Sequence, residues 1–294
     1  MILNKRHLLG GLALGTGIGL MLSGCSTLTA FNNLTPKDGG SRRLARDVAY
    51  GDHARQTYDV YAPTSGPKNQ KGWPVLVFFY GGNWDSGSKT DYAWMGRSLA
   101  ALGYLVVIPD YRLYPEVVYP EFMKDAASAV RHLQGQAANW GGDPQRMGVM
   151  GHSAGAFIAI SLALDEGFLT FDPLASNPFK VAIGVSGPYD FYPFDVDATL
   201  NSFGSYPRPL ETQPINHATK STTKFLLQHS RADTICRLSN AVNLDKALKK
   251  VGTESQLIVY EGLSHQDCAA AYSIPFRGKG PLRADCSKFL KANL

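Results

Sequence analysis

The residue types that could do chemistry gather first around Ser153, in the run Gly151-His152-Ser153-Ala154-Gly155. The apolar run Met147 to Met150 precedes it and small residues follow it, a pattern typical of a strand, a sharp turn and a helix. Glycines two positions either side of the serine let the strand and helix backbones pass closely while the hydroxyl stays exposed. Ala154 would open the helix, so its unpaired backbone N–H suits a developing oxyanion. The run therefore predicts a nucleophilic serine.

A serine hydroxyl is a poor nucleophile at neutral pH, so it needs an adjacent base, and the base needs a group that orients it. Two later apolar runs are followed by candidates: Asp233 comes after Lys224 to Ser230, and His265 comes after Gln256 to Tyr260. Parallel strands end at one edge of a sheet, so we expect both side chains near Ser153. The sequence predicts His265 as general base and Asp233 as its orienter, in the chain order Ser, Asp, His.

Other acidic residues and histidines compete for these roles. Asp190 and Asp195 lie before the later strand, which favours Asp233 as the acid. His229 ends a strand and is expected to fix the loop that carries the acid. His152 lies inside the sharp turn that carries Ser153, which we call the elbow, and is expected to face away from the reacting groups.

The elements that must position these residues alternate between strand and helix. Continuous apolar runs are typical of strands buried on both faces, and helical periodicity separates them. We expect strands at Pro74 to Tyr80, Tyr104 to Pro109, Met147 to His152, Lys180 to Ser186, Lys224 to Ser230 and Gln256 to Tyr260, and helices at about Tyr92 to Leu102, Pro120 to Trp140, after Ser153, Asn240 to Val251 and Asp285 to Ala292. This alternation predicts the α/β class, a mainly parallel central sheet with helices on both faces.

Three segments depart from the alternation. Residues 46 to 61 alternate polar and apolar around Gly51-Asp52 and predict an N-terminal β-hairpin, and Asp143-Pro144 predicts a turn before the elbow strand. Residues 187 to 222 hold seven prolines or glycines, several aromatics and weak periodicity. We interpret them as an insertion over the sheet's active edge, a lid or substrate wall, with a solvated excursion as the alternative.

The first residues resemble a bacterial lipoprotein signal peptide, here residues 1–24. Lys5 and Arg6 precede a short apolar run, which ends at Leu22-Ser23-Gly24-Cys25 in the manner of a lipobox. The resemblance implies lipidation of Cys25, a membrane partner reached through that lipid anchor, and a location in the bacterial cell envelope. Ser26 rather than Asp implies the outer membrane. Residues 25–45 are then expected to be a tether, and 46–294 the folded domain that carries Ser153, Asp233 and His265.

Composition limits the remaining partners. The chain has 294 residues, is 44% hydrophobic and 18% charged, and carries a formal charge of +5 without a basic run in the predicted domain, so no nucleic acid is expected to bind. Histidines and cysteines lack ligand spacing, so neither a metal nor a cofactor is predicted. Outside the cytoplasm thiols tend to pair, and we hypothesise a Cys236–Cys268 bridge, with buried free thiols as the alternative and Cys286 left over.

Several motifs together resemble one family. The elbow at Ser153, the G-G-x-W turn at Gly81 to Trp84, the D-Y-R-L-x-P-E segment at Asp110 to Glu116 and the Asp233 and His265 loops are similar to the carboxylesterase branch of the α/β-hydrolase fold. That branch includes hormone-sensitive-lipase-like esterases and kynurenine formamidases. The resemblance implies an acyl-enzyme on the serine and an oxyanion hole formed by the backbone N–H groups of Gly82, Asn83 and Ala154.

The family pattern usually begins His-Gly-Gly, whereas this chain has Tyr80 at the first position. We expect the Tyr80 hydroxyl to shape the turn in place of the imidazole. Trp84 is expected to pack beneath the turn and to contact substrate. Arg112 and Glu116 could bind substrate or form a structural ion pair that supports their loop.

These observations predict a serine hydrolase that cleaves short-acyl carboxylic esters, with a small-molecule ester as its substrate. A formamidase or amidase is the second hypothesis, because the formamidases share the G-G-x-W turn. A hydrolase-fold lipoprotein that only binds, with Tyr80 as a sign of lost activity, is the third. The oligomeric state stays open.

Overall fold

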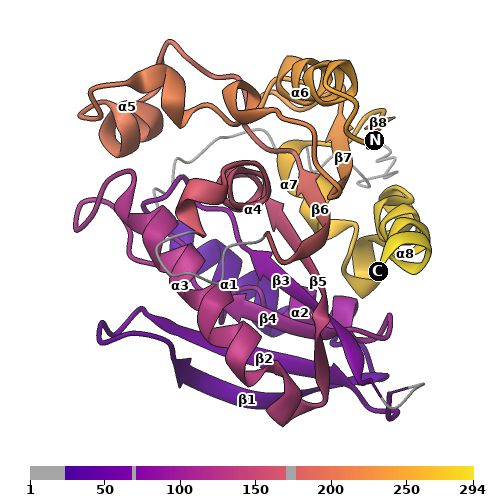
Figure 1. Cartoon of the computed structure of the whole chain (residues 1–294). Coiled ribbons are helices and arrows are strands. Elements are labelled where there is room, and N and C mark those ends of the chain that lie inside the picture. The colour runs from indigo at the N-terminus through magenta and orange to yellow at the C-terminus, as the bar shows by residue number, and fades with distance from the viewer. Residues whose placement is uncertain (1–23, 68–70, 170–176) are drawn as a thin grey trace, which may run out of the picture.

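The computed structural model describes residues 24–67, 71–169 and 177–294, and these form one eight-stranded sheet with the order β1-β2-β4-β3-β5-β6-β7-β8 (Figure 1). The strands are β1 Ser41–Ala49, β2 Thr57–Pro63, β3 Trp73–Phe79, β4 Leu105–Pro109, β5 Gly142–His152, β6 Phe179–Val185, β7 Lys224–Ser230 and β8 Ser255–Tyr260. The β1–β2 and β2–β4 pairs are antiparallel, and each further pair is parallel. The predicted α/β class, with its N-terminal hairpin, is confirmed.

Helices cover both faces of the sheet (Figure 1). They are α1 Gly24–Leu34, α2 Ala93–Ala100, α3 Glu121–Gln136, α4 Ala154–Leu164, α5 Asp197–Phe203, α6 Ser239–Lys250, α7 His265–Ala270 and α8 Leu282–Asn293. On one face α8 meets α2, because Arg283 donates to the Ser98 hydroxyl and carbonyl. On the other face α3 and α4 contact each other, and α6 lies over β7 and β8. The central strands therefore lie between helices, which explains their continuous apolar runs.

The elbow strand β5 is longer than expected. Gly142 pairs with Trp73 and Asp143 pairs with Pro74 of β3, so the expected turn at Asp143-Pro144 is wrong. The register shifts directly after Pro74, and Asp143 accepts hydrogen bonds from the Gln145 N–H and the Arg146 side chain. The pairing partner on β3 thus overrides the local turn preference of an Asp-Pro pair.

Residues 25–45 are not the irregular tether that their composition suggests. Helix α1 packs on the domain through Phe31, whose ring contacts the rings of Trp94 at 5.3 Å and Phe276 at 5.8 Å, and β1 already begins at Ser41. The predicted signal peptide lies, up to residue 23, outside the described residues. Among the described residues no helix is both long and apolar enough to cross a membrane.

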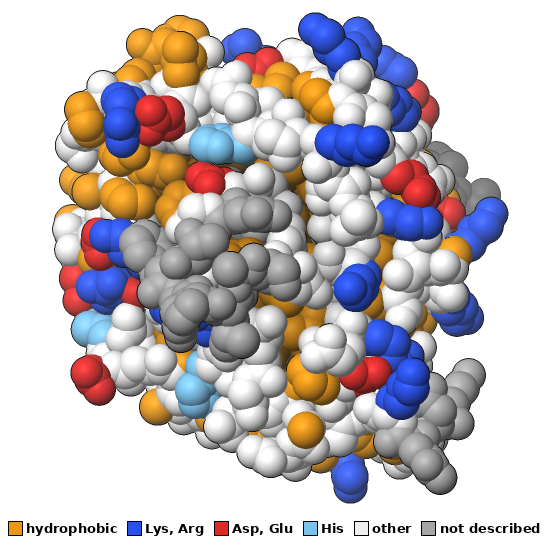
Figure 2. Space-filling view, viewed as in Figure 1, with side chains coloured by type: hydrophobic (Ala, Val, Ile, Leu, Met, Phe, Trp, Pro, Cys, Tyr) orange, Lys and Arg blue, Asp and Glu red, His pale blue; other side chains and the backbone are white. Residues whose placement is uncertain are grey.

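The segment 187–222 contains α5 and two short 3₁₀ turns, η3 Pro209–Thr212 and η4 Pro214–His217. Four of its large apolar side chains are about half exposed: Tyr192, Val196, Leu200 and Leu210. Figure 2 shows apolar side chains gathered over α5 at the upper left, whereas acidic and basic side chains are interspersed over the rest of this face. The segment thus forms an apolar projection above the carboxyl ends of the strands.

Candidate active site

Ser153 occupies the tight turn between β5 and α4 that the sequence predicts. Its backbone is left-handed, with φ 54° and ψ −124°, and its side chain is nearly buried. A Cβ on Gly151 would come within 2.0 Å of the Gly155 carbonyl oxygen, and a Cβ on Gly155 within 2.1 Å of the Phe79 carbonyl oxygen. Both flanking positions therefore require glycine, and the non-glycine φ of the serine is strain held in place by this close packing.

Asp233 and His265 meet at the same edge of the sheet. Asp233 follows β7, and its Oδ2 accepts a hydrogen bond of 2.8 Å from Nδ1 of His265, while its Oδ1 accepts from the N–H groups of Ile235 and Cys236. Burial raises the pKa of Asp233, but the hydrogen bonds from His265 and Cys236 outweigh it and hold the pKa below its ordinary value. The acid is therefore ionised, and His265 Nε2 is left for a second partner.

His265 is positioned by the start of its helix. It is the first residue of α7, whose N-cap is Ser264. The Ser264 hydroxyl accepts from the Asp267 N–H, and the Asp267 carboxylate accepts from the Ser264 N–H, which is a capping box. This fixes the backbone direction at the histidine, although the sequence patterns did not predict α7.

Two further histidines support the pair. His229 donates from Nε2 to the Cys236 carbonyl at 2.8 Å and so fixes the acid loop, as predicted. The expectation that His152 faces away is wrong: its ring lies 4.9 Å from the ring of His265, and its Nε2 donates to the His265 carbonyl. Burial, and then the nearby His265, lower the pKa of His152 to about 3, so it stays neutral.

Ser153 lies beside His265 and Asp233, but its hydroxyl makes no direct hydrogen bond to either of them. The residue before it, His152, contacts His265, and the hydroxyl of Ser153 makes no hydrogen bond to any described residue. Catalytic hydrogen bonds are often long in ligand-free enzymes and tighten when substrate binds. The structure thus joins the acid to the base and places the base next to the elbow.

The turn predicted to form the oxyanion hole, residues 80–87 and here called the oxyanion turn, lies against the elbow. A Cβ on Gly81 would stand 2.9 Å from the Ser153 Cβ. Gly82, Asn83 and Trp84 all have positive φ, at 135°, 54° and 61°. The Gly82 carbonyl accepts hydrogen bonds from the N–H groups of Asp85 and Ser86, which closes the turn and leaves the N–H groups of Gly82 and Asn83 outside that hydrogen bonding. Together with the first N–H of α4, these are the donors named from the sequence.

A pocket of about 440 Å³ opens at Ser153. Asn83, Trp84 and Ala154 line one side, segment 187–222 lines another through residues 188–199, and the acid loop contributes residues 234–240. Trp84 is 3% exposed and makes an edge contact with the Phe203 ring at 4.8 Å. Its indole Nε1 is buried, and no described residue accepts a hydrogen bond from it. Trp84 therefore borders the pocket with an unused donor.

The ion pairs of Arg112 and Glu116 show what these two residues bind. Arg112 and Glu116 do not pair with each other: Arg112 binds Asp125 at 2.7 Å, and Glu116 binds His53 at 2.7 Å. Neither lines the pocket at Ser153, so the substrate-binding role has no support.

The disulfide hypothesis is wrong, because Cys236, Cys268 and Cys286 are all buried free thiols. Burial raises the pKa of Cys268 to about 11 and that of Cys286 to about 12, so both stay protonated. Cys236 and Cys268 each lie three positions after Asp233 and His265. Although the two loops meet in space, that proximity alone does not bring the two sulfur atoms to bonding distance.

The fold of the chain has solved counterparts among esterases. The chain superposes on an inhibited esterase B from Lactobacillus rhamnosis with a TM-score of 0.77, at 17% identity, over 91% of this chain and 92% of that one. A truncated carbohydrate esterase from gut microbiota gives 0.74, at 18% identity, over 88% and 98%. The protein thus has the α/β-hydrolase fold, as the sequence resemblance implies.

The sequence then gives the family. Residues 58–248 match the family model described as BD-FAE, about two thirds of the chain, and the protein belongs to this family. It is 26% identical to an isoprenylcysteine alpha-carbonyl methylesterase of Arabidopsis thaliana over 77% of this chain and 57% of that one, and 26% identical to the probable carboxylic ester hydrolase LipM of Mycobacterium tuberculosis over 78% and 59%. The chain spans somewhat more than half the length of these curated relatives.

Proposed function

We propose that the protein is a carboxylesterase-type serine hydrolase that cleaves short-acyl esters through an acyl-enzyme on Ser153. The observation that carries the proposal is the 2.8 Å bond between His265 Nδ1 and an ionised Asp233, beside a serine held at a left-handed turn. An imidazole held in this tautomer presents Nε2 as a base. Relatives named as carboxylic ester hydrolases support the same reaction class.

The reaction follows from these positions. Ser153 Oγ attacks the ester carbonyl carbon while its proton passes to His265 Nε2, and the N–H groups of Gly82, Asn83 and Ala154 stabilise the charge on the carbonyl oxygen. The bond to the alcohol oxygen breaks as His265 returns the proton to it. Water then attacks the acyl carbon and gives a proton to His265, the bond from that carbon to Ser153 Oγ breaks, and His265 returns the proton to Oγ, which releases the carboxylic acid and restores the free serine.

The aromatic lining of the pocket supports the proposal that the acyl group of the substrate is small. Trp84 and Phe191 line the pocket together with Asn83 and Ala154, and the rings of Phe157 and Phe203 pack against both of them. The free indole N–H of Trp84 would donate to a polar substrate atom, because an unpaired buried donor is costly. Hydrolysis rates on p-nitrophenyl esters of increasing acyl length test this preference, and a maximum at long chains would contradict it.

Replacing Ser153 with Ala tests the mechanism itself. We expect p-nitrophenyl acetate turnover to fall by about a millionfold. Ser161→Ala, the same change at another buried serine of α4, is the matched control and should keep normal turnover. Labelling with a fluorophosphonate should occur on Ser153 alone; esterase activity that survives in a clean Ser153→Ala sample would refute the assignment.

We further propose that the protein is anchored in the cell envelope through a lipid on Cys25. The order of basic, apolar and lipobox segments supports the proposal. Helix α1 begins at Gly24, so the anchor would hold the domain close to the membrane surface rather than on a long tether. Cys25→Ser should move the protein from the detergent phase to the aqueous phase in Triton X-114 partitioning, and unchanged partitioning would contradict the anchor.

A further inference from the structure

The oxyanion turn is a strained segment that needs support from outside itself. Asn83 and Trp84 both have left-handed backbone, which is strained for non-glycine residues and persists only where the surrounding structure holds it. The hydrogen bonds inside the turn, from Asp85 and Ser86 to the Gly82 carbonyl, do not reach its two ends at Tyr80 and Gly87. Contacts at those ends therefore decide where the N–H groups of the turn point.

Tyr80 fixes the first end. Its side chain is fully buried, and its ring is stacked between those of Tyr92 at 5.6 Å and Tyr111 at 5.0 Å. The Tyr80 hydroxyl donates to Asp110 Oδ1 at 2.8 Å and accepts from Arg55 Nη2 at 2.8 Å, while the Tyr111 hydroxyl donates to the Tyr80 carbonyl. Burial, and then the Asp110 carboxylate, raise the pKa of Tyr80 well above its ordinary value, so the phenol stays neutral.

Arg55 joins the first end of the turn to the second. The same Nη2 that binds the Tyr80 hydroxyl also donates to the Gly87 carbonyl at 2.9 Å, and its Nε donates to the Tyr111 carbonyl at 2.8 Å. One guanidinium thus spans the turn from residue 80 to residue 87. A planar fork of donors can do this, whereas an ammonium cannot make the same contacts.

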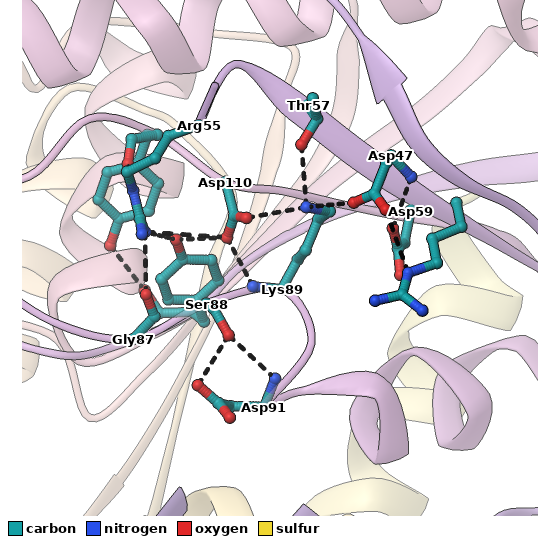
Figure 3. A network of polar contacts seen from close by, with 12 residues as sticks. Asp47, Arg55, Thr57, Asp59, Gly87, Ser88, Lys89, Asp91 and Asp110 are labelled. Carbon is teal, nitrogen blue, oxygen red and sulfur yellow. Dashed lines mark hydrogen bonds and ion pairs between the residues drawn. The ribbon is translucent and has the colours of Figure 1, made fainter. Parts of the chain in front are cut away.

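Lys89 holds the Asp110 carboxylate in place. Figure 3 shows Lys89 between two carboxylates: its Nζ lies 2.9 Å from Asp110 Oδ2 and 2.9 Å from Asp47 Oδ1, and it donates to the Thr57 hydroxyl. The Lys89 N–H also donates to Asp110 Oδ1. Burial lowers the pKa of Lys89, but the two carboxylates outweigh this and raise it overall. Two acids and two bases therefore form a charge-balanced network behind the turn, buried at Asp110 and Lys89 and reaching solvent at Asp47.

We propose that Tyr80, Arg55 and Asp110 are positioning residues that hold the N–H groups of Gly82 and Asn83 toward the reacting carbonyl oxygen. The proposal rests on the serine hydrolase function above and assigns the departure from His-Gly-Gly a defined role. None of the three side chains lines the pocket at Ser153, so they act through the backbone of the turn. Their loss should consequently slow the chemical step more than it weakens substrate binding.

Two variants with matched controls test the proposal. Tyr80→Phe removes the hydroxyl, and Tyr58→Phe removes the hydroxyl of another fully buried tyrosine, which binds His132 of α3. Arg55→Lys keeps the charge but loses the span across the turn. Arg146→Lys is its control, because Arg146 is equally exposed, at 28%, and likewise binds a buried aspartate and a backbone carbonyl.

The main readout is the rate at which a fluorophosphonate labels Ser153, since the phosphoryl oxygen takes the place of the oxyanion while fluoride leaves. Removing one oxyanion donor outright costs about 10²–10³ in rate, so displacing donors without removing them should cost about tenfold to a hundredfold. We expect Tyr80→Phe and Arg55→Lys to lower the labelling rate and kcat on p-nitrophenyl acetate by this factor, with KM changed by less than about twofold. Both controls should keep the normal rates even where their melting temperatures fall.

Normal labelling of folded Tyr80→Phe and Arg55→Lys, or equal losses in the controls, would overturn the proposal. If Tyr80→Phe does not fold, Arg55→Lys decides. Wild-type protein that is labelled but hydrolyses no ester would refute the proposed function alone, and the labelling comparison would still decide the role of the network. Wild-type protein that is not labelled at all would refute both.

Discussion

Gly81→Ala probes how closely the oxyanion turn approaches the nucleophile. Gly81 does not have a positive φ, so alanine is tolerated by the backbone and only the added methyl group matters. That Cβ would stand 2.9 Å from the Ser153 Cβ, 3.0 Å from the His152 carbonyl oxygen and 3.2 Å from the His152 Nδ1. Ordinary carbon contacts begin near 3.5 Å, so the turn and the elbow must separate by about half an ångström or more.

The size of the effect follows from this displacement. A 1 Å misplacement of reacting groups can cost about a hundredfold in rate, and overpacking a core costs about 1–3 kcal/mol. We expect kcat on p-nitrophenyl acetate to fall by about tenfold to a hundredfold, KM to change little, and the melting temperature to fall.

Gly135→Ala on α3 is the control for this change. A Cβ there meets nothing within 4 Å, and alanine in a helix should stabilise the protein slightly. Steady-state kinetics and thermal unfolding of both variants give the answer. A folded Gly81→Ala protein with normal kcat would show that the turn does not lie against Ser153 and would refute the assignment of Gly82 and Asn83.

The remaining predictions concern the acid and the buried imidazole. Asp233→Asn should lower kcat by about 10⁴, because an amide no longer holds the His265 tautomer, and a loss below tenfold in steady-state kinetics would argue against Asp233 as the orienter. His152 has a folded-state pKa of about 3, below its ordinary 6.5, so unfolding takes up a proton between these values and stability falls as pH decreases from about 6.5 toward 3. Urea unfolding of His152→Gln should show a shallower decline, by up to about 1.4 kcal/mol per pH unit, and parallel curves would contradict this.

Buried strands were the easiest part of the fold to predict. The expected strand at Lys224–Ser230 coincides with β7. The ends of the other expected strands differ by one residue or none, except at the start of β5, because continuous apolar runs have few alternatives once helices cover both faces. Residues 25–45 were harder. Their Ser, Thr and Asn content suggests a linker, but tertiary contacts such as the packing of Phe31 on Trp94 and the ion pair of Asp38 with Arg277 make them part of the domain.

The site shows the same division between local and distant information. Gly151 indicates the elbow locally, because the clash that it avoids is with the nearby Gly155 carbonyl, whereas the clash that Gly155 avoids is with the carbonyl of Phe79 on β3. The contact of His152 with His265 and the span of Arg55 across the turn depend on segments far apart in the chain. No local pattern marks these contacts, although the replacement of histidine by Tyr80 was a signal that the turn has different support.

The order of the strands explains why the base must be brought back across the sheet. The turn that follows β3 adjoins β5, so Gly82 and Asn83 reach Ser153 directly, whereas β8 is three strands away from β5, or roughly 14 Å. His265 covers that distance because it begins α7 five positions beyond the end of β8, where the Ser264–Asp267 capping box sets the direction of the chain. Asp233, on the intervening loop after β7, then meets the imidazole partway. Support for the oxyanion turn comes from the antiparallel side of the sheet, through Arg55 and Asp110, and support for the base comes from its opposite edge. Ser153 lies where these two independent supports converge, so damage to one of them should impair the reaction without disassembling the other.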